Sequence, residues 1–148
     1  MLVLTSDVAV FTVPATVVSR CGTLRTASDD CAEVEHVPVP NVSAKDMATV
    51  VEFYSRLEDL SMRDVPPATA ASHTAAFFSR MHPPDLFSVM NAANYLDARE
   101  LLEDASAYMA DLIRGKGPEA IREILHLRAD VTMEEAATIS RGFAWAFP

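Results

Sequence analysis

The segment LFSVMNAANYLD, from Leu86 to Asp97, lies at the centre of the region whose structure the sequence predicts most strongly. Its apolar residues recur at the three-and-four spacing of one helical face. Asp97 has the side chain of an N-cap, and Glu100 follows three residues later in the pattern of a capping box. The sequence therefore predicts one helix ending near Leu96 and a second one opening at Asp97. The apolar face consists of Leu86, Val89, Met90, Ala93 and Leu96.

Short helices are expected to continue from there to the C-terminal end. Residues 101–113 carry an apolar stripe wider than a solvated helix surface would show. Gly115 suits the end of that helix, and Pro118 suits the first position of the next one. Thr132 and Glu135 form another capping box, which opens a last helix ending near Trp145. Together these helices carry more apolar surface than so small a unit can bury within itself, which indicates a partner surface.

The N-terminal half alternates strands and helices. Residues 2–5 and 9–13 have the composition of two short strands, and a helix is predicted after Pro14. Residues 36–41 contain two prolines, which suits an edge strand or an extended segment, and Ser43 is expected to cap the helix that follows. This order predicts an α+β fold. The predicted inner face of the first helix is Val17, Val18, Cys21 and Leu24.

The helical pattern fades between Glu58 and Ala76, where Pro66-Pro67 prevents a helix from continuing. We predict that residues 58–76 are a mobile linker. Residues 1–57 and 77–114 would then form one domain, and residues 115–148 a C-terminal helical extension.

Composition excludes several classes of function. The chain has 148 residues, of which 50% are hydrophobic, so it is long enough for one domain with a core and is not a disordered tail. Its formal net charge of −9 argues against nucleic acid or an anionic membrane as the main partner. Two cysteines, Cys21 and Cys31, are too few for a disulfide framework. Together with the lack of a signal pattern, they predict a location in the nucleus and cytoplasm.

The sequence offers little catalytic or metal-binding chemistry. The four histidines are scattered and none has a metal ligand at a suitable spacing, so no metal, cofactor or small-molecule substrate is expected. A small hydrolase or transferase of unrelated fold is an alternative. The sequence shows no set of nucleophile, base and orienting residue that would support it. We therefore predict a protein that is not an enzyme.

Several motifs together resemble the S-phase kinase-associated (Skp) family. They are Leu86-Phe87, residues 92–97, Gly115-Lys116 with Pro118-Glu119 and Ile121-Arg122, Thr132 with Glu134-Glu135, and the closing Trp145-Ala146-Phe147, which is similar to plant members. The resemblance implies a BTB/POZ-like domain with a C-terminal helical extension. It also implies a non-catalytic adaptor that links an F-box protein to a cullin in an SCF-type ubiquitin ligase. An elongin-C-like or self-associating BTB module, or an F-box partner outside the ligase, remains an alternative.

Two docking sites follow from these observations. The apolar helical face gives the F-box-binding candidates, although Leu101 and Tyr108 could equally be core residues. Asn94 and Tyr95 are cullin-binding candidates because the resemblance implies it. From the residues alone, Asn94 could cap a helix end and Tyr95 could be half-buried core. The F-box-binding candidates are Leu101, Tyr108, Ile121, Ile124, Leu125, Leu127, Val131 and Trp145.

The chain also departs from the family pattern. Val8 stands where the family has a glycine after the hairpin aspartate, so a tight turn with positive φ is disfavoured there. Gly22 lies inside the first predicted helix and is expected to weaken it by about 0.5–1 kcal/mol relative to alanine. These departures lie in the N-terminal half, so we expect lower cullin affinity than in a typical member.

Overall fold

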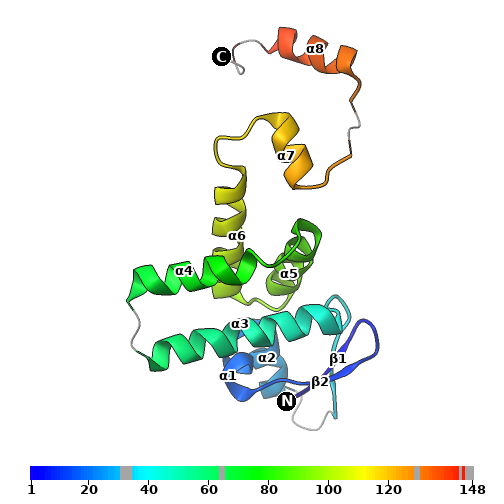
Figure 1. The fold of residues 1–148 in the computed structure, drawn as a ribbon. Coiled ribbons are helices and arrows are strands. Elements are labelled where there is room, and N and C mark those ends of the chain that lie inside the picture. The colour runs from blue at the N-terminus through cyan, green and yellow to red at the C-terminus, as the bar shows by residue number, and fades with distance from the viewer. Residues whose placement is uncertain (31–34, 64–65, 129–130, 144, 146–148) are drawn as a thin grey trace. The chain divides into compact units, whose positions relative to one another are not determined.

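The computed structural model describes residues 1–30, 35–63, 66–128, 131–143 and 145, and it leaves out the side chains of residues 30 and 67–71. Expectations for Cys31, Ala146 and Phe147 therefore lie outside the described residues. The chain divides into two units, Met1–Arg114 and Gly115–Pro148 (Figure 1). The described part is helix-rich with one small sheet, which confirms the predicted α+β class.

Among the described residues, the first unit contains the sheet and six helices, and the second contains two helices. The strands are β1 (Leu2–Thr5), β2 (Val10–Thr12) and β3 (Val37–Val39). The helices of the first unit are α1 (Ala15–Arg20), α2 (Gly22–Asp30), α3 (Ala44–Met62), α4 (Pro67–Phe78), α5 (Pro83–Tyr95) and α6 (Arg99–Ile113). The helices of the second unit are α7 (Pro118–Ile124) and α8 (Met133–Gly142).

The sheet has the strand order β2-β1-β3. β1 pairs with β2 in antiparallel fashion and with β3 in parallel, with Val3 opposite Val37. Val3 and Thr5 are buried on the inner face of β1. β3 lies at an edge, as its proline pattern predicts, because Pro38 has no N–H to give to a further strand.

The predicted first helix is two helices. α1 ends at Arg20, and Cys21 has an extended backbone with φ −105° and ψ 107° before α2 begins at Gly22. The predicted inner face is nevertheless confirmed, because Val17, Val18, Cys21 and Leu24 are all buried. In Figure 1, α1, α2 and the strands lie on one side of α3, and α4, α5 and α6 lie on its other side.

Aromatic rings fill the core on the α4 side of α3. Phe53 of α3 contacts Phe77 and Phe78 of α4, with ring centroids 5.7 and 5.9 Å apart. All three side chains are almost fully buried. Edge-to-face and stacked rings of this kind add to the stabilisation that burial of their area provides.

The segment 58–76 differs from the predicted mobile linker. α3 continues to Met62, and α4 begins at Pro67 with Pro66 as its N-cap. Proline has a φ suited to the first helical position, so Pro67 starts α4, whereas the sequence predicts that Pro66-Pro67 ends helical structure. Phe77 and Phe78 anchor this helix in the core. The helical period is hard to see because its first residues are alanine, threonine and serine.

The turn between β1 and β2 has the positive φ that Val8 was expected to disfavour. Val8 has φ 62°, in the left-handed region that β-branched residues rarely adopt. Its N–H donates to the carbonyl of Thr5 at 3.0 Å, and the side chain is 78% exposed. The tight turn therefore forms at a cost in backbone energy that no packing of Val8 offsets.

Replacing Val8 by glycine is expected to stabilise the protein. Left-handed backbone costs a residue with a Cβ about 1–2 kcal/mol, and part of this gain is lost to the greater freedom of glycine in the unfolded chain. We expect a net gain of about 1 kcal/mol in the free energy of unfolding, measured by urea denaturation. Val8→Ala is the control, because it removes the exposed side chain and keeps the Cβ. A Gly variant no more stable than the Ala variant would contradict this explanation.

The second unit confirms three local predictions. Gly115 has φ +70° just after α6, and Pro118 is the first residue of α7. The Thr132 hydroxyl accepts from the Glu135 N–H at 3.3 Å, and the Glu135 carboxylate accepts from the Thr132 N–H at 2.8 Å, which completes the capping box. α8 ends at Gly142, three residues before the predicted end, because glycine is a poor helix former.

Candidate docking surfaces

The turn after α5 closes that helix by backbone hydrogen bonds. The N–H of Ala98 donates to the carbonyl of Ala93 at 2.8 Å, and the N–H of Asp97 donates to that of Asn94 at 3.3 Å. Asp97 has φ 51°, and both alanines are buried. These features define a Schellman motif, in which Asp97 takes the left-handed position that glycine usually occupies.

Asp97 is therefore not an N-cap, and the predicted capping box at Asp97 and Glu100 is wrong. α6 begins at Arg99 after Ala98, with no side-chain cap. The Glu100 carboxylate instead forms an ion pair with Arg20 of α1 at 2.7 Å. The spacing of Asp97 and Glu100 suits a capping box. Aspartate also tolerates positive φ, however, and Asp97 closes the end of α5 instead.

The start of α2 packs against this turn. The N–H of Gly22 donates to the carbonyl of Asp97 at 3.2 Å, and the N–H of Thr23 donates to that of Leu96 at the same distance. A Cβ at Gly22 would collide with the Asp97 side chain. The sequence predicts that Gly22 weakens the interior of a helix, which is wrong. Gly22 is the first residue of α2, and its lack of a Cβ permits α2 to approach the turn closely.

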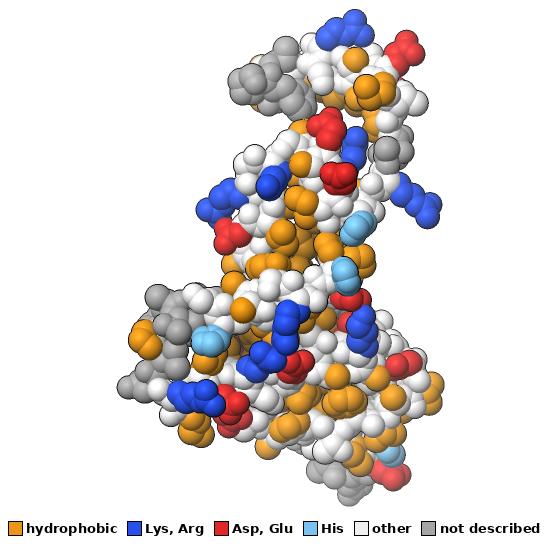
Figure 2. Space-filling view, viewed as in Figure 1, with side chains coloured by type: hydrophobic (Ala, Val, Ile, Leu, Met, Phe, Trp, Pro, Cys, Tyr) orange, Lys and Arg blue, Asp and Glu red, His pale blue; other side chains and the backbone are white. Residues whose placement is uncertain are grey.

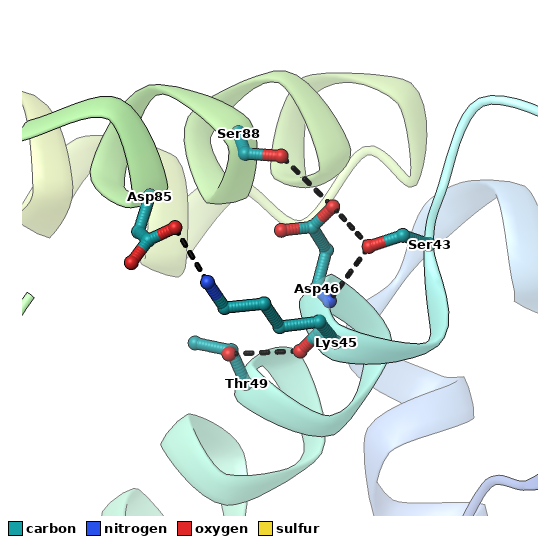
Figure 3. A network of polar contacts seen from close by, with 6 residues as sticks. All are labelled: Ser43, Lys45, Asp46, Thr49, Asp85 and Ser88. Atoms are coloured by element: carbon teal, nitrogen blue, oxygen red, sulfur yellow. Dashed lines mark hydrogen bonds and ion pairs between the residues drawn. The ribbon is translucent and has the colours of Figure 1, made fainter.

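A polar network joins α5, near its middle, to the start of α3 (Figure 3). The buried Asp46 carboxylate accepts hydrogen bonds from the hydroxyl groups of Ser43 and Ser88, at 2.6 and 2.9 Å. The Ser43 hydroxyl also accepts from the Asp46 N–H at 3.1 Å, which confirms Ser43 as the predicted cap of α3. Lys45 pairs with Asp85 at 2.5 Å on the exposed side, where an ion pair contributes little. Ser88, near the middle of α5, thus ties this helix to α3, and α2 contacts its C-terminal end.

The two cullin-binding candidates lie at the C-terminal end of this anchored helix. Asn94 is exposed and Tyr95 is half-buried. The end of α5 is closed by the backbone of Asp97 and Ala98 and not by the Asn94 side chain. The exposed amide beside a half-buried ring is an arrangement common at the rims of protein interfaces.

The F-box-binding candidates divide between the two units. In the first unit, Leu101 is fully buried, and the half-buried Tyr108 lies against Phe78 with ring centroids 5.8 Å apart. Leu101 is thus a core residue, which is the alternative that its sequence left open. In the second unit, Leu127 and Trp145 are 55% and 84% exposed. The remaining candidates, all half-buried, are Ile121, Ile124, Leu125 and Val131.

The second unit also exposes apolar residues that the sequence analysis missed. They are Met133, Ile139 and Phe143, with exposed fractions of 91%, 46% and 52%. The last two share three-and-four spacing with Ala136, so the helical period could have found them. Neither α7 nor α8 buries a residue fully. Figure 2 shows hydrophobic side chains at the surface of both helices.

The described residues show little that could serve a reaction. Burial, with a contribution from the charge of Asp97, raises the pKa of the Cys21 thiol to about 12, so it stays a neutral thiol at physiological pH. Within the described ranges, no three acidic, histidine or cysteine side chains form a group that could hold a metal ion. No helix in the part of the chain that the structure describes is both long and apolar enough to cross a membrane.

An α+β unit with an anchored surface helix, followed by helices with exposed apolar side chains, is typical of proteins that dock others. A model of the Skp1 family, dimerisation domain, matches residues 99–146. The chain is 35% identical to SKP1-like protein 14 of Arabidopsis thaliana, over 80% of this chain and 76% of that protein. It is 32% identical to SKP1-like protein 20 of Oryza sativa subsp. japonica, over 93% and 89% respectively.

A fungal relative extends the similarity beyond plants. The E3 ubiquitin ligase complex SCF subunit sconC of Emericella nidulans is 31% identical, over 99% of this chain and 96% of that protein. The chain belongs to the Skp1 family, as the sequence motifs predict. Members of this family are non-catalytic subunits, and the chain is not an enzyme.

Proposed function

We propose that this chain is the adaptor subunit of an SCF-type ubiquitin ligase, which bridges an F-box substrate receptor to a cullin scaffold. The first unit would be a BTB/POZ-like domain that binds the cullin. The second unit would bind the F-box protein. The nucleus and the cytoplasm are the compartments in which we expect this to occur. The similarity to the fungal relative, which is named as an SCF subunit, supports the proposal.

The F-box surface rests on one observation above all. α7 and α8 carry apolar side chains, and neither helix buries any residue fully. Helices of 7 and 10 residues are too short to be stable in water by propensity alone, so they need tertiary packing. A helical F-box segment packed on Ile121, Ile124 and Trp145 would supply it and would give one shared core.

The cullin surface rests on the geometry of α5. Asn94 and Tyr95 stand on a helix that contacts α3 through Ser88, near its middle, and α2 at its C-terminal end. A rigid surface loses little conformational freedom when it binds, which favours affinity. This pair lies in the first unit, whereas the apolar residues of the proposed F-box surface, Ile121, Ile124 and Trp145, lie in the second. The two partners can therefore be tested independently.

The test of this proposal is simultaneous binding. An immobilised cullin N-terminal fragment should retain an F-box protein only when this chain is present. A self-associating or elongin-C-like module would retain the cullin fragment and leave the F-box protein in solution. That outcome would contradict the bridging role.

A further inference from the structure

The backbone that presents Asn94 and Tyr95 is held by a residue far away in the sequence. A helix leaves its last carbonyl groups without partners within the helix. At the end of α5, the carbonyl of Tyr95 accepts a hydrogen bond from the Thr23 hydroxyl at 2.8 Å. The carbonyl of Leu96 accepts one from the Thr23 N–H at 3.2 Å. A single residue of α2 therefore holds two consecutive carbonyl groups of the turn.

This is an unusual use of a threonine at the start of a helix. Hydroxyl groups there commonly bond to the backbone of their own segment. Thr23 is the second residue of α2, yet its hydroxyl donates to a residue 72 positions away. Thr26, on the same helix, shows the ordinary behaviour: its hydroxyl donates to the carbonyl of Gly22 at 3.1 Å. The Thr23 hydroxyl thus serves the contact between α2 and α5.

The Schellman motif explains why an external partner is available at this point. The carbonyl groups of Ala92, Ala93 and Asn94 accept from the N–H groups of Leu96, Ala98 and Asp97. The chain then turns away, so the carbonyl of Tyr95 is left for a group outside the motif. Thr23 is close enough because Gly22 has no Cβ where the Asp97 side chain lies.

We infer that Thr23 is a positioning residue for cullin docking, which acts through the backbone of Tyr95 without itself being the contact. This inference rests on the proposed function of Asn94 and Tyr95. The direction of a side chain follows from the backbone that carries it, so fixing the carbonyl of Tyr95 limits the orientations of its ring. A surface fixed before binding gives higher affinity than one that the partner must order.

The test is the replacement Thr23→Val, which removes the hydroxyl and keeps the shape of the side chain. Loss of one positioning hydrogen bond should weaken binding of a cullin N-terminal fragment by about threefold to tenfold, measured by isothermal titration calorimetry. F-box affinity should stay within twofold of the parent. Hydrogen–deuterium exchange should accelerate in the peptide covering residues 93–98 and remain unchanged in α4.

Three variants make the result interpretable. Thr23→Ser keeps the hydroxyl and should restore cullin affinity. Thr26→Val removes a hydroxyl from the same helix and should leave cullin affinity unchanged. Thr23→Ala removes the hydroxyl with less volume, and it replaces the valine variant if that one does not fold.

The outcomes separate this inference from the proposed function. Normal cullin affinity in the Thr23→Val and Thr23→Ala variants overturns the positioning role, even if replacement of Asn94 and Tyr95 abolishes binding. If replacement of Asn94 and Tyr95 has no effect, the proposed cullin site itself is wrong, and the inference fails with it. Equal losses of cullin and F-box affinity in the Thr23 variants also overturn it, because they would indicate general destabilisation.

Discussion

Replacing both Asn94 and Tyr95 by lysine is expected to abolish cullin binding and to leave F-box binding intact. The variant removes the ring of Tyr95 and places two positive charges at a rim that loses water on binding. Loss of an aromatic anchor contact costs about 2 kcal/mol or more, so the Kd for a cullin N-terminal fragment should rise at least about 30-fold. Isothermal titration calorimetry with each partner in turn gives both affinities.

The control for this variant adds the same charge elsewhere on the first unit. Ala48 and Ser55 are exposed positions of α3, seven residues apart, and their replacement by lysine adds two charges away from the end of α5. The control should bind both partners like the parent. Parent-like cullin affinity in the variant at Asn94 and Tyr95 would show that these two residues are structural.

Two substitutions in the second unit are expected to weaken F-box binding strongly. Ile121→Asp places an unpaired charge in an apolar contact, and Trp145→Ala removes the most exposed large aromatic side chain described in this unit. Each should cost about 2 kcal/mol or more in binding free energy, measured by fluorescence anisotropy with a labelled F-box segment.

A variant with the same charge at another exposed position tests whether the loss of F-box binding depends on where the charge lies or on the charge alone. Ala137 is exposed on α8, and the helical period places it away from the face formed by Ala136, Ile139 and Phe143. Ala137→Asp adds the same charge and should retain the parent affinity. Cullin binding should be unchanged in all three variants. If the Ile121 and Trp145 variants fold and bind the F-box segment like the parent, the proposed surface is misplaced.

Local chemistry predicted several element boundaries correctly. The boundaries at Gly115 and Pro118 depend on the backbone geometry of those residues themselves. The boundary at Thr132 depends on hydrogen bonds to a residue three positions away. The sequence displays both partners of such an interaction, so the prediction needs no knowledge of the fold. The strands and the buried face of α1 and α2 followed from periodicity for the same reason.

The turn at Asp97 could not be predicted in this way. Its role depends on the carbonyl groups of α5 and on the N–H groups of Gly22 and Thr23, more than 70 positions earlier. The local pattern of Asp97 followed by Glu100 indicates a capping box. In the structure, Asp97 instead closes the end of α5, and Glu100 pairs with Arg20 of α1. The role of Gly22 could not be predicted from the local sequence for the same reason. A Cβ at this position would collide with the side chain of Asp97, which is distant in the sequence.

The sequence predicted which residues are candidates for docking surfaces, but it could not predict which of them are exposed. Periodicity found the apolar residues of α6 and α7 but could not tell which of them face the core. Leu101 is fully buried among neighbours of the first unit, whereas Leu127 lies open in the second. Burial is a property of the packed chain, so the exposed fraction had to come from the structure.

The central claim is that one molecule of this chain holds a cullin and an F-box protein at the same time. Size-exclusion chromatography with multi-angle light scattering measures this directly, from the mass of the complex in a mixture of the three proteins. We expect a species with the summed mass of one copy of each protein, which disappears when this chain is left out. Two separate binary complexes, with no species of the summed mass, would contradict the bridging role.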